Sequence, residues 1–317
     1  MTGAGQNIGS DLKGYLYRKW RNSSAPVRRA SVLSAAKYLV TPFSGFILSN
    51  YFLSPEVAEG GFHYLNSTSQ NLLTGARPLV DGTVVYVQSD IIERFTQEIL
   101  PTIDKDFYLI TGKWHLPSLT LTKAADTLIG SPKVLAWYSQ NQVNPDVPIF
   151  PFPFGIELTT APLVRRLMSE NLHRKHTDVL VPHVRIHPHF TSEVREIRSS
   201  LTSLMEPEMP IRQYLRLIRR SRFVVSPPGD RPDTYRHWES IALGAVPVGN
   251  LGGPLRDLFG GSMMSVEDFA DFSRNAFPKY AAPDVSLVLL DTWRRRLVQP
   301  PPLPSRPQQR GSGIQEI

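Results

Sequence analysis

The sequence predicts an α/β protein built on parallel β-sheets. Short apolar runs bounded by turn residues are typical of buried strands, and they lie at residues 83–88, 107–111, 134–138, 179–184 and 223–225. Segments with helical spacing of apolar residues alternate with these runs, at residues 91–103, 119–129, 161–173, 194–204 and 211–218. This alternation predicts parallel strands joined by helical crossovers. The length of 317 residues and the hydrophobic content of 41% suit about two globular domains.

A proline-rich stretch divides the predicted elements into two groups. Residues 147–155 (VPIFPFPFG) cannot form a central strand or a helix interior, because each Pro removes a backbone donor and fixes φ. We therefore expect a first domain at residues 1–157 and a second at residues 158–285. The last periodic segment predicts a terminal helix at residues 286–298, and the Pro- and Gly-rich residues 299–317 predict a disordered tail.

Composition excludes several classes of protein. The absence of cysteine rules out disulfide scaffolds, thiol nucleophiles and Cys-ligated metal sites. The most apolar early stretch, residues 31–53, is interrupted by Lys37 and Pro42 and is too short to span a bilayer. The N-terminus lacks a basic region that leads into a compact apolar core and a cleavage site. We expect a soluble, cytoplasmic protein with no membrane span, and loss of a membrane anchor from the chain stays an open alternative.

Basic residues are concentrated in the second half of the chain. Lys and Arg total 35 against 28 Asp and Glu, a net charge of +7, and most of the excess lies in residues 161–317. Guanidinium groups suit phosphate because their planar donor fork binds oxygens in pairs. The second half is therefore predicted to bind an anion, with a solvated basic surface as the alternative reading of any single Arg pair. The alternative function is a non-enzymatic basic module that binds an acidic polysaccharide or nucleic acid, although no nucleic-acid motif is present.

Residues 221–250 carry the most specific pattern in the chain. They predict, in order, a short strand, a turn-rich loop, a helix, a Gly turn and a second short strand. Asp233 is the predicted N-cap of this helix, and Gly244 is its predicted end. The side chains that fall off the apolar side of the helix are free to meet a ligand, and these are Tyr235, Arg236 and Glu239.

The loop and the start of this helix suit an anion. A helix N-terminus leaves unpaired N–H groups and a partial positive charge, which favour phosphate. Gly229 permits close backbone approach, Ser226 offers a hydroxyl and Arg236 adds a full charge. Glu239 lies one turn further, about 4.5 Å along the helix axis. The spacing suits a nucleotide diphosphate, with phosphates at the helix tip and ribose hydroxyls at the carboxylate, or else a structural Arg236–Glu239 ion pair.

The same segment resembles the nucleotide-sugar-binding motif of exostosin-like glycosyltransferases. In that motif a Ser-Pro-x-Gly loop and an Asp precede an Arg-x-Trp-Glu helix and a Gly-x-x-Pro-Val strand. The matching residues here are Ser226, Pro227, Gly229, Asp233, Arg236, Trp238, Glu239, Gly244, Pro247 and Val248. Residues 137–157 resemble the family segment in which an aromatic residue, Gln and Asn precede a Pro-rich turn. Residues 81–95 and 106–112 are weaker matches.

The resemblance implies a glycosyltransferase of the GT-B architecture, in which two Rossmann-like domains face a cleft and a terminal helix crosses back to the first domain. It implies inverting transfer from a nucleotide-diphosphate sugar, most often a uridine-diphosphate (UDP) sugar, to a glycan hydroxyl. Arg236 would neutralise the diphosphate and Glu239 would bind the ribose. Arg185 joins them because ligands gather at the carboxyl ends of parallel strands. The predicted donor-binding residues are Arg185, Ser226, Pro227, Gly229, Asp233, Tyr235, Arg236 and Glu239.

The general base is the least specified part of the predicted site. Inverting transfer needs a base that takes the proton of the acceptor hydroxyl, and this base should project from the first domain. The candidates that follow predicted strands or the proline-rich turn are His115, Asp90 and Glu157, and we favour His115 and then Asp90 as catalytic residues. Members of the resembled family place an Asp shortly after the strand that corresponds to residues 107–111, whereas this chain has Lys113, Trp114 and His115 there.

The sequence predicts no metal and no required cofactor. Asp104 and Asp106 imitate a metal-binding Asp-x-Asp motif, but they precede a predicted strand instead of following one. His183, His187 and His189 alternate near a strand without a nearby carboxylate or fourth ligand. A nicotinamide-dependent oxidoreductase is disfavoured because the Gly fingerprint of such enzymes is missing. The predicted partners are a nucleotide sugar and a glycan or glycoconjugate acceptor, and no nucleic acid.

Overall fold

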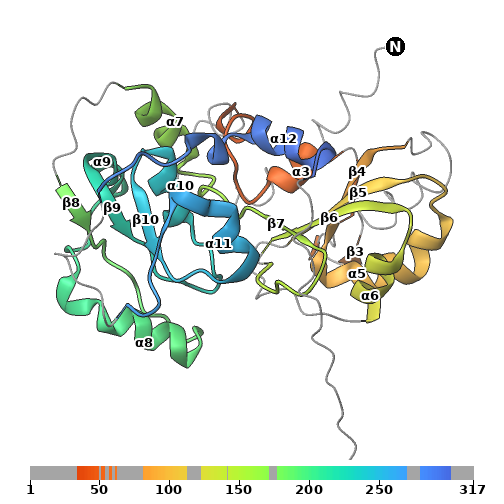
Figure 1. The fold of residues 1–317 in the computed structure, drawn as a ribbon, viewed down its shortest axis with the longest axis horizontal. Helices are drawn as coiled ribbons and strands as arrows, with labels where there is room; N and C mark the ends of the chain where they lie inside the picture. Colours follow the sequence, from red (N-terminus) through yellow and green to blue (C-terminus); the bar gives the residue numbers. More distant parts are fainter. Residues whose placement is uncertain are drawn as a thin grey trace, which may run out of the picture.

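Two parallel β-sheets organise this computed structural model, which describes residues 34–49, 51–53, 57–58, 61–62, 81–112, 123–140, 142–170, 177–269 and 279–300 (Figure 1). The first sheet has the strand order β1 (Tyr51–Leu53), β4 (Thr83–Gln88), β5 (Phe107–Gly112), β6 (Val134–Gln140) and β7 (Phe150–Phe152). The second has the order β11 (Met264–Ser265), β10 (Val246–Gly249), β9 (Ser221–Val225) and β8 (Thr177–Leu180). All neighbouring strands in both sheets are parallel. The predicted α/β class with parallel sheets is confirmed.

Most predicted strands form at their predicted positions, and the exceptions have physical causes. The strand predicted at residues 179–184 is displaced: β8 ends at Leu180, two residues before Pro182, which has no N–H for a sheet ladder. The proline-rich stretch contributes only the three-residue β7 at the edge of the first sheet, where Pro151 is tolerated. The short strands β1 and β11 were not predicted, and neither is long enough to create a periodic pattern. Two further short strands, β2 (Val57–Ala58) and β3 (Gly61–Phe62), pair with each other in antiparallel fashion.

Helices cover the first sheet on both faces. One face packs against α6 (Lys123–Gly130) and a helical run that comprises α5 (Ile92–Arg94), the π-helical residues Phe95–Ile99 and the 3-10 turn Leu100–Thr102. This run confirms the helix predicted at residues 91–103. Its π-helical and 3-10 turns were not predicted. On the other face lie α3 (Ser44–Leu48) and α12 (Leu290–Val298). The first part of the helix predicted at residues 119–129 lies outside the described residues.

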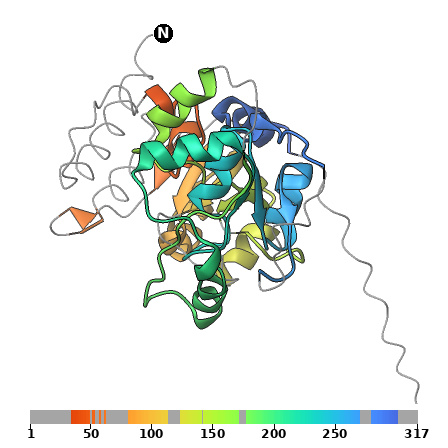
Figure 2. The same cartoon turned by 90° about the vertical axis from the view of Figure 1, so that its left-hand side faces the viewer.

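The second sheet is likewise covered on both faces. The helices α9 (Ile211–Arg220), α10 (Tyr235–Ala242) and α11 (Gly253–Phe259) bury their apolar residues against one face, and α7 (Ala161–Ser169) packs on α9 and α10. The helix α8 (Ser192–Ser200) lies on the opposite side of this sheet from α7 and α9 (Figures 1 and 2). The core between α9, α10 and the second sheet is continuous with the core of the first sheet.

The chain returns from the second sheet to the first at its C-terminal end. After the 3-10 turn Val285–Val288, α12 places the carbonyl oxygen of Arg296 2.5 Å from the hydroxyl of Tyr138 in β6. The Trp293 ring meets Phe152 of β7 edge to face, at 5.5 Å between centroids. The predicted terminal helix is therefore present, and it packs against the first sheet.

The two sheets fall on either side of the predicted division at residue 157, and the extent of each domain stays a prediction. Residues 301–317, most of the predicted disordered tail, lie outside the described residues. Among the helices that the structure describes, none is long and apolar enough to cross a membrane.

Candidate functional site

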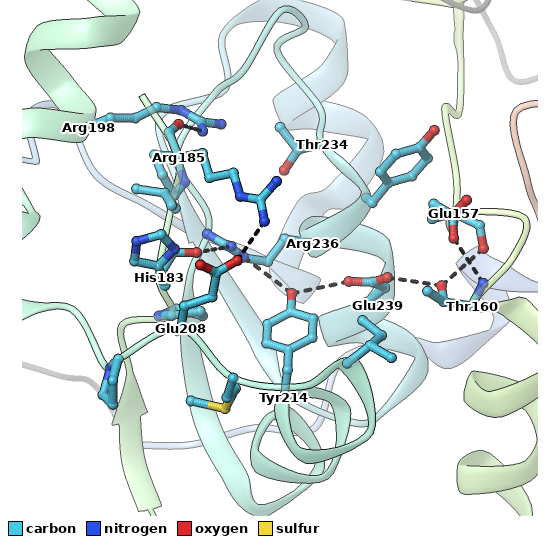
Figure 3. Close-up of a pocket in the computed structure, with 17 residues that line it drawn as sticks. Glu157, Thr160, His183, Arg185, Arg198, Glu208, Tyr214, Thr234, Arg236 and Glu239 are labelled. Atoms are coloured by element: carbon cyan, nitrogen blue, oxygen red, sulfur yellow. Dashed lines mark hydrogen bonds and ion pairs between the residues drawn. The ribbon is translucent and has the colours of Figure 1, made fainter. Parts of the chain in front are cut away.

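A pocket of about 410 Å³ opens at the carboxyl-terminal edge of the second sheet (Figure 3). Its walls come from the segment after β8, the first turn of α10, the start of α9 and the turn that precedes α7. Figure 3 shows Arg185, Arg198 and Arg236 on one side, and Glu239 and Glu157 towards the other. The predicted donor-binding residues that line this pocket are Arg185, Pro227, Tyr235, Arg236 and Glu239.

The N-terminus of α10 is built differently from the prediction. Thr234 is the N-cap, and its backbone N–H donates to Nδ1 of His237 at 3.1 Å. The prediction of Asp233 as the N-cap was wrong, because the Asp233 carboxylate bonds to other parts of the chain. Its Oδ2 accepts hydrogen bonds from the Phe154 backbone N–H at 3.0 Å and from the Trp238 indole at 2.8 Å. Asp233 is fully buried, which raises the pKa of its carboxyl to about 6, and it ties α10 to the turn after β7 instead of lining the pocket.

Arg236 and Glu239 both face the pocket, and a tyrosine connects them. The Arg236 Nε donates to the Tyr214 hydroxyl at 3.2 Å, and that hydroxyl donates to Glu239 Oε2 at 3.1 Å. The alternative of a direct Arg236–Glu239 ion pair is therefore wrong. A second guanidinium nitrogen, Nη2 of Arg236, donates to the His183 carbonyl at 2.9 Å. Among the described residues no hydrogen bond is made by the third guanidinium nitrogen, Nη1, which is therefore available for a ligand.

Glu239 is a buried carboxylate at the inner end of the pocket. Only 4% of the residue is exposed, and Oε1 accepts a hydrogen bond from the Thr160 hydroxyl at 3.2 Å. Burial raises the pKa of Glu239 to about 7, although the hydrogen bonds and the Arg236 charge oppose this shift. Near neutral pH this carboxylate is thus poised between its charged and neutral forms, and it can accept hydrogen bonds from a pair of hydroxyl groups.

Arg198 is a pocket residue that the sequence reasoning missed. It is 9% exposed, its Nε donates to the Pro228 carbonyl at 2.7 Å, and its Nη1 donates to the Arg185 carbonyl at 2.7 Å. These bonds join the segment after β8 to the loop after β9. Burial lowers the pKa of Arg198 to about 10, so its guanidinium stays charged at neutral pH. The sequence offered one signal for this role, because Arg198 is a charged residue on the inward face of the helix predicted at residues 194–204.

Gly229 contributes to this junction without lining the pocket. A Cβ atom at Gly229 would lie 3.1 Å from Nη2 of Arg198, so the glycine permits the close approach of loop and guanidinium. Ser226 also lies away from the pocket. It is fully buried, and its hydroxyl donates to the Val224 carbonyl at 3.1 Å. The structure therefore gives Ser226 a bond back to the end of β9 and no place at the pocket wall.

Arg185 and Glu208 form an ion pair at the mouth of the pocket. The Arg185 Nη2 atom lies 2.6 Å from Glu208 Oε1, and both side chains are largely exposed. This contact lowers the pKa of Glu208 and raises that of Arg185. An anion that enters the pocket would compete with Glu208 for Arg185.

The three candidates for the general base lie in different parts of the chain. Glu157 lines the pocket, and its Oε2 accepts hydrogen bonds from the Thr160 backbone N–H at 2.9 Å and from the Thr159 hydroxyl. Asp90 lies in the 3-10 turn Ser89–Ile91, directly after β4, where the backbone reaches the carboxyl-terminal edge of the first sheet. His115 lies outside the described residues. Both favoured candidates, Asp90 and His115, stay predictions.

Histidine and acidic residues make no evident metal centre in the part of the chain that the structure describes, where no group of three or more suitable ligands is found. The rings of His187 and His189 stack on each other with centroids 5.1 Å apart. Asp104 and Asp106 lie in the turn that leads into β5.

No protein-family model matches the chain, and no curated protein matches it. The function therefore has to be inferred from the site itself.

Proposed function

We propose that this chain is a glycosyltransferase that transfers a sugar from a nucleotide-diphosphate donor, a UDP-sugar by the resemblance of its motif, to a glycan hydroxyl. The observation that carries the proposal is the convergence of Arg185, Arg198 and Arg236 with the N-terminus of α10 on one pocket. Three guanidinium groups and the partial positive charge at the N-terminus of a helix favour a doubly or triply charged anion. The pocket volume of about 410 Å³ lies in the range of small-molecule sites.

The proposed donor lies along the pocket from the arginines to Glu239. Its diphosphate contacts Arg236 and the first turn of α10, with Arg198 and Arg185 beside them. Its ribose hydroxyls donate to Glu239, which Tyr214 and Thr160 hold in place. The Tyr235 ring, stacked on Phe154 at 4.7 Å between centroids, supplies a flat wall next to this path.

The proposed architecture is GT-B, with the acceptor on the side of the first sheet. Two parallel sheets, a terminal helix that returns to the first sheet, and a pocket beside the turn between the sheets support this assignment. In the proposed reaction the oxygen of the acceptor hydroxyl attacks the anomeric carbon while a base takes its proton. The bond between that carbon and the diphosphate oxygen breaks, and the electron pair leaves with the nucleoside diphosphate.

Positive charge at the pocket would stabilise this leaving group without a metal ion. Arg236 is the principal contributor, because it lies on the first turn of α10 and keeps one guanidinium nitrogen free of described partners. Asp90 and His115 are proposed as bases from the first half, and Glu157 is a third candidate that lines the pocket.

Thermal-shift measurements with UDP, GDP and ADP test the proposal. A nucleotide that binds only the folded chain raises its melting temperature saturably, so we expect UDP to do so. If none of the three nucleotides raises it, the donor site is contradicted. Binding of a polyanion that falls steeply with salt, together with no response to nucleotides, would instead support the non-enzymatic basic module.

A further inference from the structure

Tyr214, on α9, stands between the two oppositely charged side chains of the pocket (Figure 3). Arg236 and Glu239 lie three positions apart on α10, a spacing at which an arginine and a carboxylate can pair directly. Here the Arg236 Nε donates to the Tyr214 hydroxyl at 3.2 Å, and that hydroxyl lies 3.1 Å from Glu239 Oε2. A direct pair would occupy both charged groups with each other. With the hydroxyl between them, both face the pocket and can meet a ligand.

The direction of these two hydrogen bonds follows from the chemistry of the groups. An arginine nitrogen can only donate, so the Tyr214 oxygen accepts from Arg236. The single proton of that hydroxyl then goes to the Glu239 carboxylate. Burial and the Glu239 charge raise the pKa of Tyr214 above its usual value, so the hydroxyl keeps this proton. Tyr214 is therefore a donor to Glu239 whenever that carboxylate is charged.

The Tyr214 ring and the Glu239 carboxylate are both held in place. The ring packs against the core that α9 and α10 share, and the Arg236 guanidinium carbon lies 5.8 Å from its centroid. The other carboxylate oxygen, Glu239 Oε1, accepts from the Thr160 hydroxyl at 3.2 Å. One donor on each oxygen orients the carboxylate and leaves both oxygens able to accept a further hydrogen bond. This remaining capacity suits two neighbouring hydroxyl groups.

We propose that Tyr214 is the positioning residue that makes the pocket select a ribonucleotide over a nucleotide without ribose hydroxyls. The inference rests on the proposed donor site and names the part of the donor that Tyr214 controls. Tyr214 acts through Glu239, because its hydroxyl keeps the carboxylate apart from Arg236 and oriented towards the 2′- and 3′-hydroxyls. A site built in this way rejects an analogue that lacks the hydroxyls, because a buried acceptor would then stay unpaired.

The selectivity for UDP over 2′,3′-dideoxyuridine diphosphate (ddUDP) tests this role, because the two ligands share their base, diphosphate and charge. Titration calorimetry gives the ratio of the two dissociation constants for each protein. We expect wild-type protein to bind UDP at least about tenfold more tightly than ddUDP. In Tyr214→Phe, which keeps the ring and its packing, this ratio should fall at least about threefold. Tyr280→Phe is the matched control: its hydroxyl donates to the Gly244 carbonyl at 2.6 Å, outside the pocket, and its ratio should equal that of wild type.

The ratio distinguishes positioning from a loss of structure. A merely structural role for Tyr214 would weaken UDP and ddUDP equally, so an unchanged ratio in Tyr214→Phe would overturn the proposal. Glu239→Gln is the second variant, and its ratio should fall as well. If it keeps the wild-type ratio, the selectivity does not pass through Glu239 and the proposal is contradicted. No UDP binding to wild-type protein would contradict the donor site and this inference together, whereas UDP binding without preference over ddUDP would contradict only the role of Tyr214.

Discussion

Ionisation of Glu239 should produce a clear pH dependence in the free energy of unfolding. Its pKa is raised by burial from 4.5 to about 7, so the folded chain holds a proton that the unfolded chain has already released between these values. Stability from this group is therefore complete below about pH 4.5 and is lost as pH rises through 7. At about 1.4 kcal/mol per pKa unit, the loss is on the order of 3 kcal/mol.

Glu239→Gln isolates this effect. We expect the free energy of unfolding of wild-type protein to fall relative to Glu239→Gln as pH rises from 4.5 to 8, measured by urea unfolding at each pH. Asp233, whose pKa is also raised, is present in both proteins and cancels in the difference. A difference that stays constant across this range would show that Glu239 titrates as an exposed carboxylate does.

Glu208 should compete with an anionic ligand of the pocket for Arg185. Its carboxylate pairs with Arg185 at 2.6 Å, so Glu208→Gln frees the guanidinium and removes a negative charge from the mouth. Because the pair is exposed, the gain is small, and we expect UDP to bind about two- to fivefold more tightly to the variant. Titration calorimetry at low salt measures this, with Glu193→Gln on the outer helix α8 as the control. Weaker UDP binding by Glu208→Gln would place Glu208 among the ligand contacts.

Sequence reasoning at the residue scale brought some of its predicted donor-binding residues to the pocket wall and misplaced others. Arg236 and Glu239 were predicted from helical spacing, and both line the pocket. Asp233 and Ser226 were assigned to the ligand, yet both are buried. The partner of Asp233 is the backbone of Phe154, 79 residues earlier, and no local pattern reveals such a contact.

At the scale of elements, the turn after β7 depends on one glycine. Gly155 has a φ of +85°, and a Cβ atom there would lie 2.5 Å from the Val40 carbonyl oxygen. That oxygen accepts the Ile156 N–H at 2.8 Å, so the clash involves backbone that cannot move freely. We expect Gly155→Ala to lower the free energy of unfolding by more than about 3 kcal/mol, as strain and overpacking combine.

Gly82→Ala is the matched control for this turn. Gly82 has a nearly identical φ of +80°, but the nearest atom to its Cβ would be Tyr108 Cε2 at 3.9 Å. Only the conformational penalty applies there, about 1 to 2 kcal/mol. Urea unfolding of both variants compares them. Equal losses in the free energy of unfolding would mean that the close approach of Val40 to Gly155 adds nothing to the cost of Gly155→Ala.

Element types were predictable where a pattern was long, and element ends were not. The strand β4 has the bounds predicted from the apolar run at residues 83–88. The strand β8 ends early because of Pro182, and the helix predicted at residues 91–103 passes from a 3-10 turn through α- and π-helical segments to a second 3-10 turn. These details depend on the fit of each turn to its neighbours, which periodicity does not encode.

At the scale of the whole molecule, α12 closes the fold by packing on the first sheet. Trp293 is 1% exposed, and its indole donates to the Leu287 carbonyl at 2.9 Å. We expect Trp293→Ala to lower the free energy of unfolding by about 3 to 5 kcal/mol, in the range of large core truncations. Arg294→Ala, on the exposed side of the same helix, should stay within about 0.5 kcal/mol of wild type. Similar losses in the two variants would contradict the packing of α12 on the first sheet.

The class of the fold followed from alternating strands and helices, while the order of its strands did not. In both sheets the described strands of the main ladder follow one another in chain order. Nothing in the sequence distinguishes this order from one that reverses at a central strand. The return of α12 was expected only through a resemblance of the motif at residues 221–250, since a terminal amphipathic helix could cover either sheet.

The central claim is that the pocket at the tip of α10 binds a nucleoside diphosphate through Arg236. Titration calorimetry of UDP against wild-type protein, Arg236→Ala and Arg222→Ala measures it directly. Loss of a charge-assisted contact of about 1.5 to 3 kcal/mol corresponds to a factor of about ten to a hundred in affinity. We predict saturable binding to wild-type protein and to Arg222→Ala, and binding at least tenfold weaker to Arg236→Ala. No binding to wild-type protein, or equal affinity for Arg236→Ala, would contradict the account.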